Sequence, residues 1–232
     1  MARIRGIVFD KDGTLFDFQA TWGAWSRTMI EAESGGDPRL RDRIAEALGY
    51  DLGRGRFRPE SIVIASTTET VAEHLLPVIG GTSKDELMAR MNERARDAPQ
   101  VEAAPLPEVL GRLAGMGLAL GIATNDTEEP ARAHLRAAGV EGAFGFIAGF
   151  DSGWGGKPAP GQLLAFAEAV GLAPAECVMV GDSLHDLHAA RDAGMIGVAV
   201  LTGVAGREVL EPAADAVLGS IAELPDWVAA QG

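Results

Sequence analysis

The sequence contains one cysteine, few basic residues and no long apolar run. Cys177 stands alone among 232 residues, so no disulfide can form within the chain, which is typical of a reducing compartment. Its 20 lysines and arginines are outnumbered by 33 aspartates and glutamates, and the net charge of −13 argues against a general surface for nucleic acid or anionic membranes. No stretch approaches the ~18 uncharged apolar residues of a membrane span, and the N-terminal sequence does not form a secretory signal. We expect a cytoplasmic protein that binds neither nucleic acid nor membrane.

What the sequence does contain is an alternation of short apolar runs with helical segments. Six apolar runs are typical of buried strands: residues 4–9, 118–123, 144–148, 178–180, 196–201 and 216–218. Four helix-like segments each end at a glycine: residues 106–116, 128–138, 161–170 and 184–193. This alternation predicts an α/β fold, a Rossmann-like doubly wound parallel sheet with crossover helices.

The segment from residue 18 to residue 102 has a different pattern. Apolar residues recur in it at helical spacing, and we find no convincing pair of strands. We therefore expect an all-helical insert directly after the first strand, with an α/β core formed by residues 1–17 and 103–232. Asp17 is expected to cap the first helix of the insert. Trp22 and Trp25 are expected to pack mainly in its interior.

Chemically versatile side chains follow several of the expected strands. In an open parallel sheet, ligands bind outside the carboxyl ends of the strands, so we expect these side chains to share one edge. They are Asp10, Asp12, Thr124, Asn125, Asp182 and Asp186, with Lys157 in a loop that leads into a helix.

Such a cluster of carboxylates repels itself unless a cation is shared, and an all-oxygen set of ligands suits Mg²⁺. Together with Mg²⁺, Lys157 and the Thr124–Asn125 pair have the groups needed to hold a phosphoryl group. A carboxylate beside that group can attack phosphorus and form an aspartyl-phosphate. Asp12 can protonate the leaving oxygen and later deprotonate water.

Four motifs carry a resemblance to a known family. They are DKDGTL (10–15), ATND (123–126), KPAP (157–160) and VGDSLHDL (180–187). Their order and approximate spacing resemble those of the haloacid dehalogenase-like (HAD) hydrolase superfamily, and most closely its phosphoglycolate-phosphatase-like members with a helical cap. The resemblance covers the α/β core, and the helical insert falls where that family has its cap domain.

The resemblance implies a role for each motif residue. Asp10 would be the nucleophile, Asp12 the general acid and base, and Thr124 a phosphate ligand. Lys157 would steady the phosphoryl oxygens and take part in catalysis. For Asn125, phosphate binding and capping of the next helix remain equally open.

The resemblance also implies a Mg²⁺ site formed by Asp10, the main-chain carbonyl of Asp12, and Asp182. Asp186 would be a supporting or alternative ligand. The expected activity is Mg²⁺-dependent hydrolysis of a small-metabolite phosphomonoester, such as phosphoglycolate or a sugar phosphate. The partner would be that ester, and the enzyme could be a monomer or a homodimer.

Two residues depart from the family pattern: Lys11 stands where an apolar residue is more common, and Asn125 stands where glycine is frequent. We expect Asp126 to cap the following helix. His185 and His188 are three residues apart with no further histidine or cysteine nearby, so we favour an exposed helix face over zinc. Cys177 is expected to be a packing residue.

Three arginines, Arg54, Arg56 and Arg58, lie close together in the insert of an otherwise acidic protein. They lie either in a solvated loop or in a part of the cap that binds a substrate carboxylate or second phosphate.

Three other functions are compatible with parts of the sequence. A haloacid dehalogenase needs no metal and no acid two residues after the nucleophile, so Asp12 and the pair Asp182 and Asp186 disfavour it. A phosphomutase cannot be separated from a hydrolase by these motifs. A non-enzymatic phospho-ligand sensor, such as a receiver domain, is much shorter and has no comparable insert.

Overall fold

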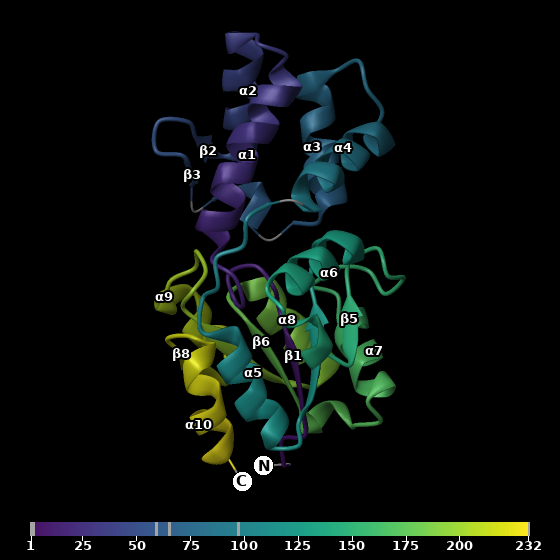
Figure 1. Ribbon diagram of the computed structural model, residues 1–232, viewed down its shortest axis with the longest axis vertical. Helices are drawn as coiled ribbons and strands as arrows, with labels where there is room; N and C mark the ends of the chain where they lie inside the picture. Colours follow the sequence, from purple (N-terminus) through teal and green to yellow (C-terminus); the bar gives the residue numbers. More distant parts are fainter. Residues whose placement is uncertain (1–2, 59, 65, 97, 232) are drawn as a thin grey trace.

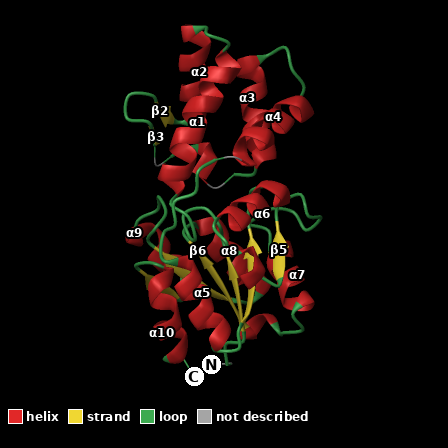
Figure 2. Cartoon of the chain, viewed as in Figure 1, coloured by secondary structure: helices red, strands yellow, loops and turns green. Residues whose placement is uncertain are grey.

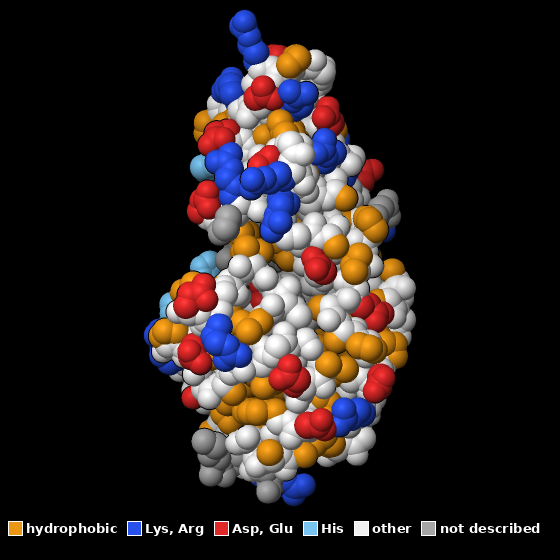
Figure 3. All heavy atoms as spheres, turned by 90° about the vertical axis from the view of Figure 1, so that its left-hand side faces the viewer, with side chains coloured by type: hydrophobic (Ala, Val, Ile, Leu, Met, Phe, Trp, Pro, Cys, Tyr) orange, Lys and Arg blue, Asp and Glu red, His pale blue; other side chains and the backbone are white. Residues whose placement is uncertain are grey.

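The chain folds into two bodies, one built on a sheet and one built of helices (Figure 1). The computed structural model describes residues 3–58, 60–64, 66–96 and 98–231. The molecule narrows where the two bodies meet (Figure 3). No helix in these four ranges is both long enough and apolar enough to cross a membrane.

The sheet body contains, among the described residues, six parallel strands in the order β5-β4-β1-β6-β7-β8. Their bounds are β1 (Gly6–Phe9), β4 (Ala119–Ala123), β5 (Phe146–Ala148), β6 (Cys177–Gly181), β7 (Ile196–Val200) and β8 (Ala216–Leu218). In the middle of the sheet, Val8 of β1 is in register with Gly121 on one side and Met179 on the other. The chain adds β4 and β5 on one side of β1 and then β6 to β8 on the other, so the strand order reverses at β1. Crevices for ligands form at such a reversal.

Helices cover both faces of this sheet (Figure 2). Ile7 and Phe9 pack with the apolar residues of α5 (Leu106–Gly115), α6 (Glu128–Ala137) and α10 (Leu224–Ala229) on one face. Val8 packs on the other face with α7 (Gly161–Ala169) and α8 (Leu184–Ala193). The remaining short helices are α9 (Arg207–Leu210), η2 (Glu141–Ala143), η3 (Pro174–Glu176), η4 (Glu211–Ala213) and η5 (Ile221–Glu223). The predicted doubly wound parallel α/β fold is confirmed.

The helical body, called the insert below, follows β1 in sequence. It consists of α1 (Phe18–Ser34), α2 (Pro38–Leu48), η1 (Ile62–Ile64), α3 (Thr68–Ile79) and α4 (Lys84–Arg96), with a small strand pair. These helices enclose a hydrophobic cluster of their own, to which Trp22 and Trp25 belong. Asp17 caps α1 as predicted, since its side chain accepts a hydrogen bond of 2.8 Å from the Ala20 amide.

The expectation of an all-helical insert is wrong in one respect. Strands β2 (Tyr50–Asp51) and β3 (Arg56–Phe57) pair antiparallel. The rings of Tyr50 and Phe57 pack edge to face at 5.2 Å, and the Asp51 side chain accepts hydrogen bonds from two amides of the connecting turn. Two residues per strand are too few to produce the alternation of apolar and polar residues by which a strand is recognised.

Two backbone segments connect the insert to the sheet body, and they pair with each other. The amide of Asp17 donates to the Val101 carbonyl at 2.8 Å, and the amide of Ala103 donates to the Leu15 carbonyl at 2.9 Å. Phe16 and Glu102 form an antiparallel bridge between these two bonds. The connection is therefore a short two-stranded ribbon.

Candidate active site

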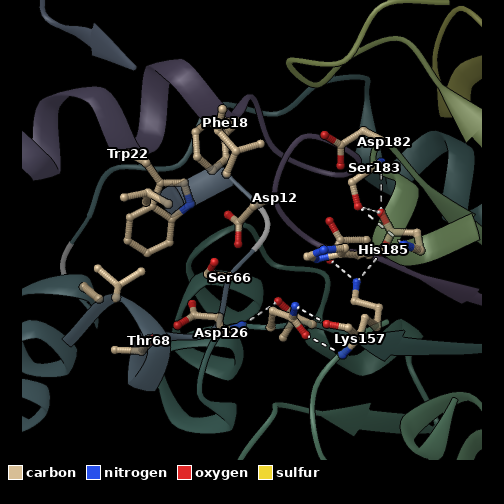
Figure 4. Close-up of a pocket in the computed structure, with 18 of the residues that line it drawn as sticks. Asp12, Phe18, Trp22, Ser66, Thr68, Asp126, Lys157, Asp182, Ser183 and His185 are labelled. Carbon is tan, nitrogen blue, oxygen red and sulfur yellow. Dashed lines mark hydrogen bonds and ion pairs between the residues drawn. The ribbon is translucent and has the colours of Figure 1, made fainter. Parts of the chain in front are cut away.

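A cavity lies between the carboxyl ends of the central strands and the insert (Figure 4). Most of the residues singled out from the sequence line it. These are Asp10, Asp12, Thr124, Asn125, Lys157, Asp182 and Asp186. The sheet topology explains this convergence, because β1, β4 and β6 are neighbours and all end at the same edge.

Lys157 ties two of the carboxylates together. Its ammonium group donates hydrogen bonds of 2.6 Å to Asp10 and of 2.6 Å to Asp186, and only 3% of its side chain is exposed. Burial alone would lower the pKa of Lys157, but attraction to Asp10 and Asp186 outweighs it and raises that pKa above its ordinary value. Lys157 is therefore a permanent positive charge beside Asp10.

Asp10, Asp182 and Asp186 form a cluster in which one oxygen from each lies within 4.8 Å of the others. Burial raises the pKa of Asp10 to about 7; repulsion by Asp186 and Asp12 adds to this, and attraction to Lys157 opposes it. The pKa of Asp182 is also raised well above its usual range, by burial and then by repulsion from Asp10 and Asp186. Without a cation, this cluster holds too much buried negative charge for one lysine to balance.

The donor set of this cluster fits a hard divalent cation. All of its ligand atoms are carboxylate oxygens, which Mg²⁺ prefers. The backbone around it leaves room for these carboxylates: a Cβ on Gly13 would lie 2.4 Å from an Asp182 oxygen, and one on Gly181 would lie 2.3 Å from the Asp186 carboxyl carbon. Glycine at both positions is thus a steric requirement of the acidic cluster.

Asp186 uses its second oxygen in a helix cap. The hydroxyl of Ser183 and the amide of Ser183 donate to it at 2.6 and 3.0 Å, which closes a capping box at the start of α8. Its first oxygen accepts from Lys157. Both oxygens of Asp186 therefore already have hydrogen-bond donors. The bond from Lys157 allows Asp186 to orient the lysine side chain.

Asn125 secures the loop that carries Lys157. Its side-chain amide donates to the Lys157 carbonyl at 2.9 Å, and its side-chain oxygen accepts from the Lys157 amide at 2.8 Å. This pair of bonds joins the end of β4 to the lysine loop. Thr124 lies beside it, and its hydroxyl accepts a hydrogen bond of 3.1 Å from the Asp126 amide.

The prediction that Asp126 caps the following helix is wrong. Thr127 occupies the N-cap position of α6, and the amide of Glu128 donates to Asp151 from another loop. The carboxylate of Asp126 instead lies 3.5 Å from the ammonium of Lys11. We attribute the orientation of the Asp126 side chain to its attraction to the buried Lys11 ammonium. Thr127, the next residue, is the N-cap of α6.

Lys11 is the centre of a buried network that the sequence did not reveal. Its side chain is fully buried, and its ammonium lies 2.7 Å from Asp12 and 5.4 Å from the centre of the Trp22 ring. It also lies 3.1 Å from Nδ1 of His134. Burial alone would lower the pKa of Lys11, but attraction to Asp12 and Asp126 raises it. Lys11 therefore acts as a fixed cation under the cavity floor.

The hydrogen bonds of His134 define its tautomer. Because an ammonium group can only donate, Nδ1 of His134 accepts from Lys11, and Nε2 then donates to the Ala95 carbonyl of α4 at 2.7 Å. Burial, and then the charge of Lys11, lower the pKa of His134 to about 4, so the ring is neutral. A continuous chain of contacts thus runs from Asp12 through Lys11 and His134 into the insert.

The structure places Arg54, Arg56 and Arg58 outside the cavity lining. Arg58 pairs with Glu46, and 80% of the Arg54 side chain is exposed beside Asp51. These arginines lie in and beside the β2–β3 loop, on the side of the insert where Figure 3 shows basic side chains gathered. A role for them in specificity stays a prediction. Cys177 is buried at the start of β6, as expected for a packing residue.

Comparison with known proteins identifies the family. The model of the haloacid dehalogenase-like hydrolases matches residues 4–194. The chain belongs to this family. As a HAD-like hydrolase it is 30% identical over 228 residues to the phosphoglycolate phosphatase of Neisseria meningitidis, a match that covers 97% of this chain and 89% of the relative. The hydrolase class predicted from the sequence, with phosphoglycolate-phosphatase relatives, is confirmed.

Solved structures share the fold of this HAD-like hydrolase. A predicted phosphoglycolate phosphatase from Haemophilus somnus has a TM-score of 0.74 at 18% identity, over 98% of this chain and 99% of its own. CbbY from Rhodobacter sphaeroides, solved in complex with phosphate, has a TM-score of 0.72 at 22% identity, over 95% of this chain and 96% of its own. The likeness extends to both the sheet body and the insert.

Proposed function

We propose that this HAD-like hydrolase is a Mg²⁺-dependent phosphatase that hydrolyses the phosphomonoester of a small metabolite through an aspartyl-phosphate. The observation that carries the proposal is the position of Asp10. It lies at the end of the central strand, within 2.6 Å of the Lys157 ammonium and within the three-aspartate cluster. A carboxylate so placed can approach a phosphoryl group whose charge its neighbours balance.

The residues that would hold Mg²⁺ are Asp10, the main-chain carbonyl of Asp12, and Asp182, with Asp186 in support. When bound, the ion supplies positive charge that neutralises the cluster and the phosphoryl oxygens. Lys157 supplies a second positive charge, and Thr124 supplies a hydroxyl donor. The paired hydrogen bonds from Asn125 keep Lys157 in this position.

The reaction proceeds in two steps that use Asp10 and Asp12. In the first, a carboxylate oxygen of Asp10 bonds to phosphorus as the ester oxygen leaves, and Asp12 gives that oxygen a proton. In the second, Asp12 takes a proton from water, and the water oxygen attacks the aspartyl-phosphate to release inorganic phosphate and free Asp10. Asp12 therefore begins the cycle protonated and regains its proton from water in the second step. Lys11, 2.7 Å from Asp12, holds that carboxyl group in place.

The insert forms the other wall of the cavity, and we assign it the role of a cap. Closure over the bound ester would exclude bulk water from the aspartyl-phosphate. The lone buried Cys177 supports the further prediction that the enzyme works in the reducing cytoplasm.

The test is phosphate release from an aryl phosphate ester. The wild-type enzyme should be active with Mg²⁺ and inactive with a chelator, and Asp10→Asn should lower kcat at least about 10³-fold. Asp17→Asn is the matched control, because it makes the same chemical change at a helix cap outside the cavity, and it should retain activity. Unchanged activity in Asp10→Asn would refute the proposed nucleophile. In a parallel assay with a sugar phosphate, recovery of an isomeric phosphate ester in place of inorganic phosphate would indicate a phosphomutase.

A further inference from the structure

The wall that the insert contributes to the cavity is mostly apolar. Its side chains include Phe18, Trp22, Ile64, Val71 and Met91. Figure 4 shows Phe18 and Trp22 on one side of the cavity, with Asp182 and Lys157 on the other. Because the phosphoryl group must bind beside Asp10 and Lys157, the rest of the substrate extends toward this apolar wall.

This wall offers no positive charge. Among the described residues that line the cavity, the basic residue types are Lys157 and His185, and Figure 4 shows both on the side of Asp182. Lys157 is already engaged by Asp10 and Asp186. Basic residues of α4 are paired elsewhere, Arg90 and Arg94 with Glu33 and Arg96 with Glu129.

The residues outside the described ranges cannot supply a basic side chain either. In the sequence they are Met1, Ala2, Pro59, Ala65, Asp97 and Gly232. A carboxylate or second phosphate on the substrate would therefore lose its water against apolar side chains without gaining a cation. Burial of an unpaired charge is strongly unfavourable.

Asp126 adds a negative charge at this end of the cavity. Its Oδ1 accepts from the Thr127 amide, whereas its Oδ2 is buried and accepts no hydrogen bond, with the Lys11 ammonium 3.5 Å away. Figure 4 shows the Asp126 carboxylate beside Ser66 and Thr68 of the insert. Asp126 lines the cavity, so a substrate hydroxyl or amino group could donate to its carboxylate, and a second anion would be repelled by it.

We propose, building on the phosphatase function above, that the substrate is the phosphomonoester of an uncharged or cationic alcohol. This alcohol has an apolar body that packs against Trp22 and Phe18, and a hydroxyl or amino group that donates to Asp126. Esters with a carboxylate or a second phosphate, which include phosphoglycolate, are poor substrates. Selection is thus set by the absence of a cation on the insert wall and by the charge of Asp126.

The first test compares benzyl phosphate, 4-(hydroxymethyl)benzyl phosphate and 4-carboxybenzyl phosphate, together with 2-phosphoglycolate and its neutral amide. These sets vary the charge of the leaving group at nearly constant size. The value of kcat/KM for 4-carboxybenzyl phosphate should be at least about 10-fold lower than the values for the two neutral benzyl phosphates. The value for 2-phosphoglycolate should be lower than that for its amide by a similar factor. Equal or better turnover of the carboxylates overturns the inference and leaves the phosphatase intact, whereas no hydrolysis of any of these esters refutes the phosphatase and the inference together.

The second test introduces a cation into the insert wall. Ser66→Lys should raise the ratio of kcat/KM for 4-carboxybenzyl phosphate to that for benzyl phosphate by about 10-fold or more, because an ion pair becomes available. Ser66→Gln is the matched control of similar length and should leave this ratio near the wild-type value. Asp126→Asn should shift the ratio in the same direction as Ser66→Lys.

Both kcat/KM values come from one preparation of each variant, so a partly unfolded sample does not alter their ratio. If neither Ser66→Lys nor Asp126→Asn changes the ratio, this wall does not contact the leaving group and the inference is wrong.

Discussion

Replacement of Lys11 by methionine should destabilise the protein strongly. Methionine fills nearly the same volume but leaves Asp12 and Asp126 without the cation that lies 2.7 and 3.5 Å from them. Removal of one partner from a buried ion pair costs about 3–5 kcal/mol. The Asp12 side chain is 16% exposed and can be partly hydrated, so we expect about 3 kcal/mol, which in a chain of this size lowers Tm by about 6–12 °C.

The loss of stability caused by Lys11→Met should become smaller as the pH falls. Burial, and then repulsion by Asp12, already raise the pKa of Asp126 to about 6 against the attraction of Lys11, and that pKa rises further once Lys11 is removed. A protonated Asp126 needs no cation. The difference in Tm between wild type and Lys11→Met should therefore be largest at pH 8 and shrink as the pH falls to 5.5.

Thermal unfolding followed by circular dichroism at both pH values measures this difference. The control is Lys84→Met, since Lys84 pairs with Glu69 and Glu73 at the surface of the insert, and such a pair contributes about 1 kcal/mol or less. The double variant Lys11→Met, Asp126→Asn should recover part of the lost stability. If Lys11→Met and Lys84→Met lower Tm equally at pH 8, Lys11 does not balance buried charge and our account of the network fails.

Three further predictions concern the cluster, His134 and Asn125. Asp182→Asn should raise the Tm of the metal-free protein, because it removes a buried, repelled carboxylate, and should abolish the increase in Tm caused by Mg²⁺; a Mg²⁺ effect as large as in wild type would exclude Asp182 as a ligand. The pKa of His134 falls from 6.5 to about 4 on folding, so its stabilisation is complete above pH 6.5 and is lost as the pH falls toward 4. The difference in free energy of unfolding between wild type and His134→Gln, measured in urea, should thus narrow by about 2–3 kcal/mol between pH 7 and 4.5, and a constant difference would contradict a neutral ring. Asn125→Ala should lower kcat by about 10-fold or more through displacement of Lys157, because it removes both hydrogen bonds to the lysine loop; an unchanged kcat would assign Asn125 another role.

The sheet and most of the site were predictable because both depend on local sequence and on one rule of topology. A buried run such as Ile7 to Phe9 and the helices that end at glycine identify strands and crossovers. Parallel strands then bring their carboxyl ends to one edge, which is enough to place Asp10, Thr124 and Asp182 together.

The Lys11 network was not predictable, because its partners come from distant segments and nothing in a local pattern pairs them. In the sequence, Lys11 is only a departure from an apolar position, and the pattern around Asp126 predicts a helix cap. Their interaction depends on how far β1 and β4 extend past each other at the sheet edge. The one available signal was His134, a polar residue on the apolar side of its helix beside Ala131 and Leu135.

The paired backbone segments that join the two bodies make the insert an exchangeable unit. The amides of Asp17 and Ala103 each donate a hydrogen bond to the other segment of the ribbon. The chain therefore leaves the sheet body and returns to it at adjacent points. A foreign insert with similarly spaced ends could be grafted between Phe16 and Glu102 while every strand of the sheet stays in place. Chimaeras joined there would keep Asp10, Asp126 and Lys157 of one parent and acquire the apolar insert wall of the other, which separates the two contributions to leaving-group selectivity.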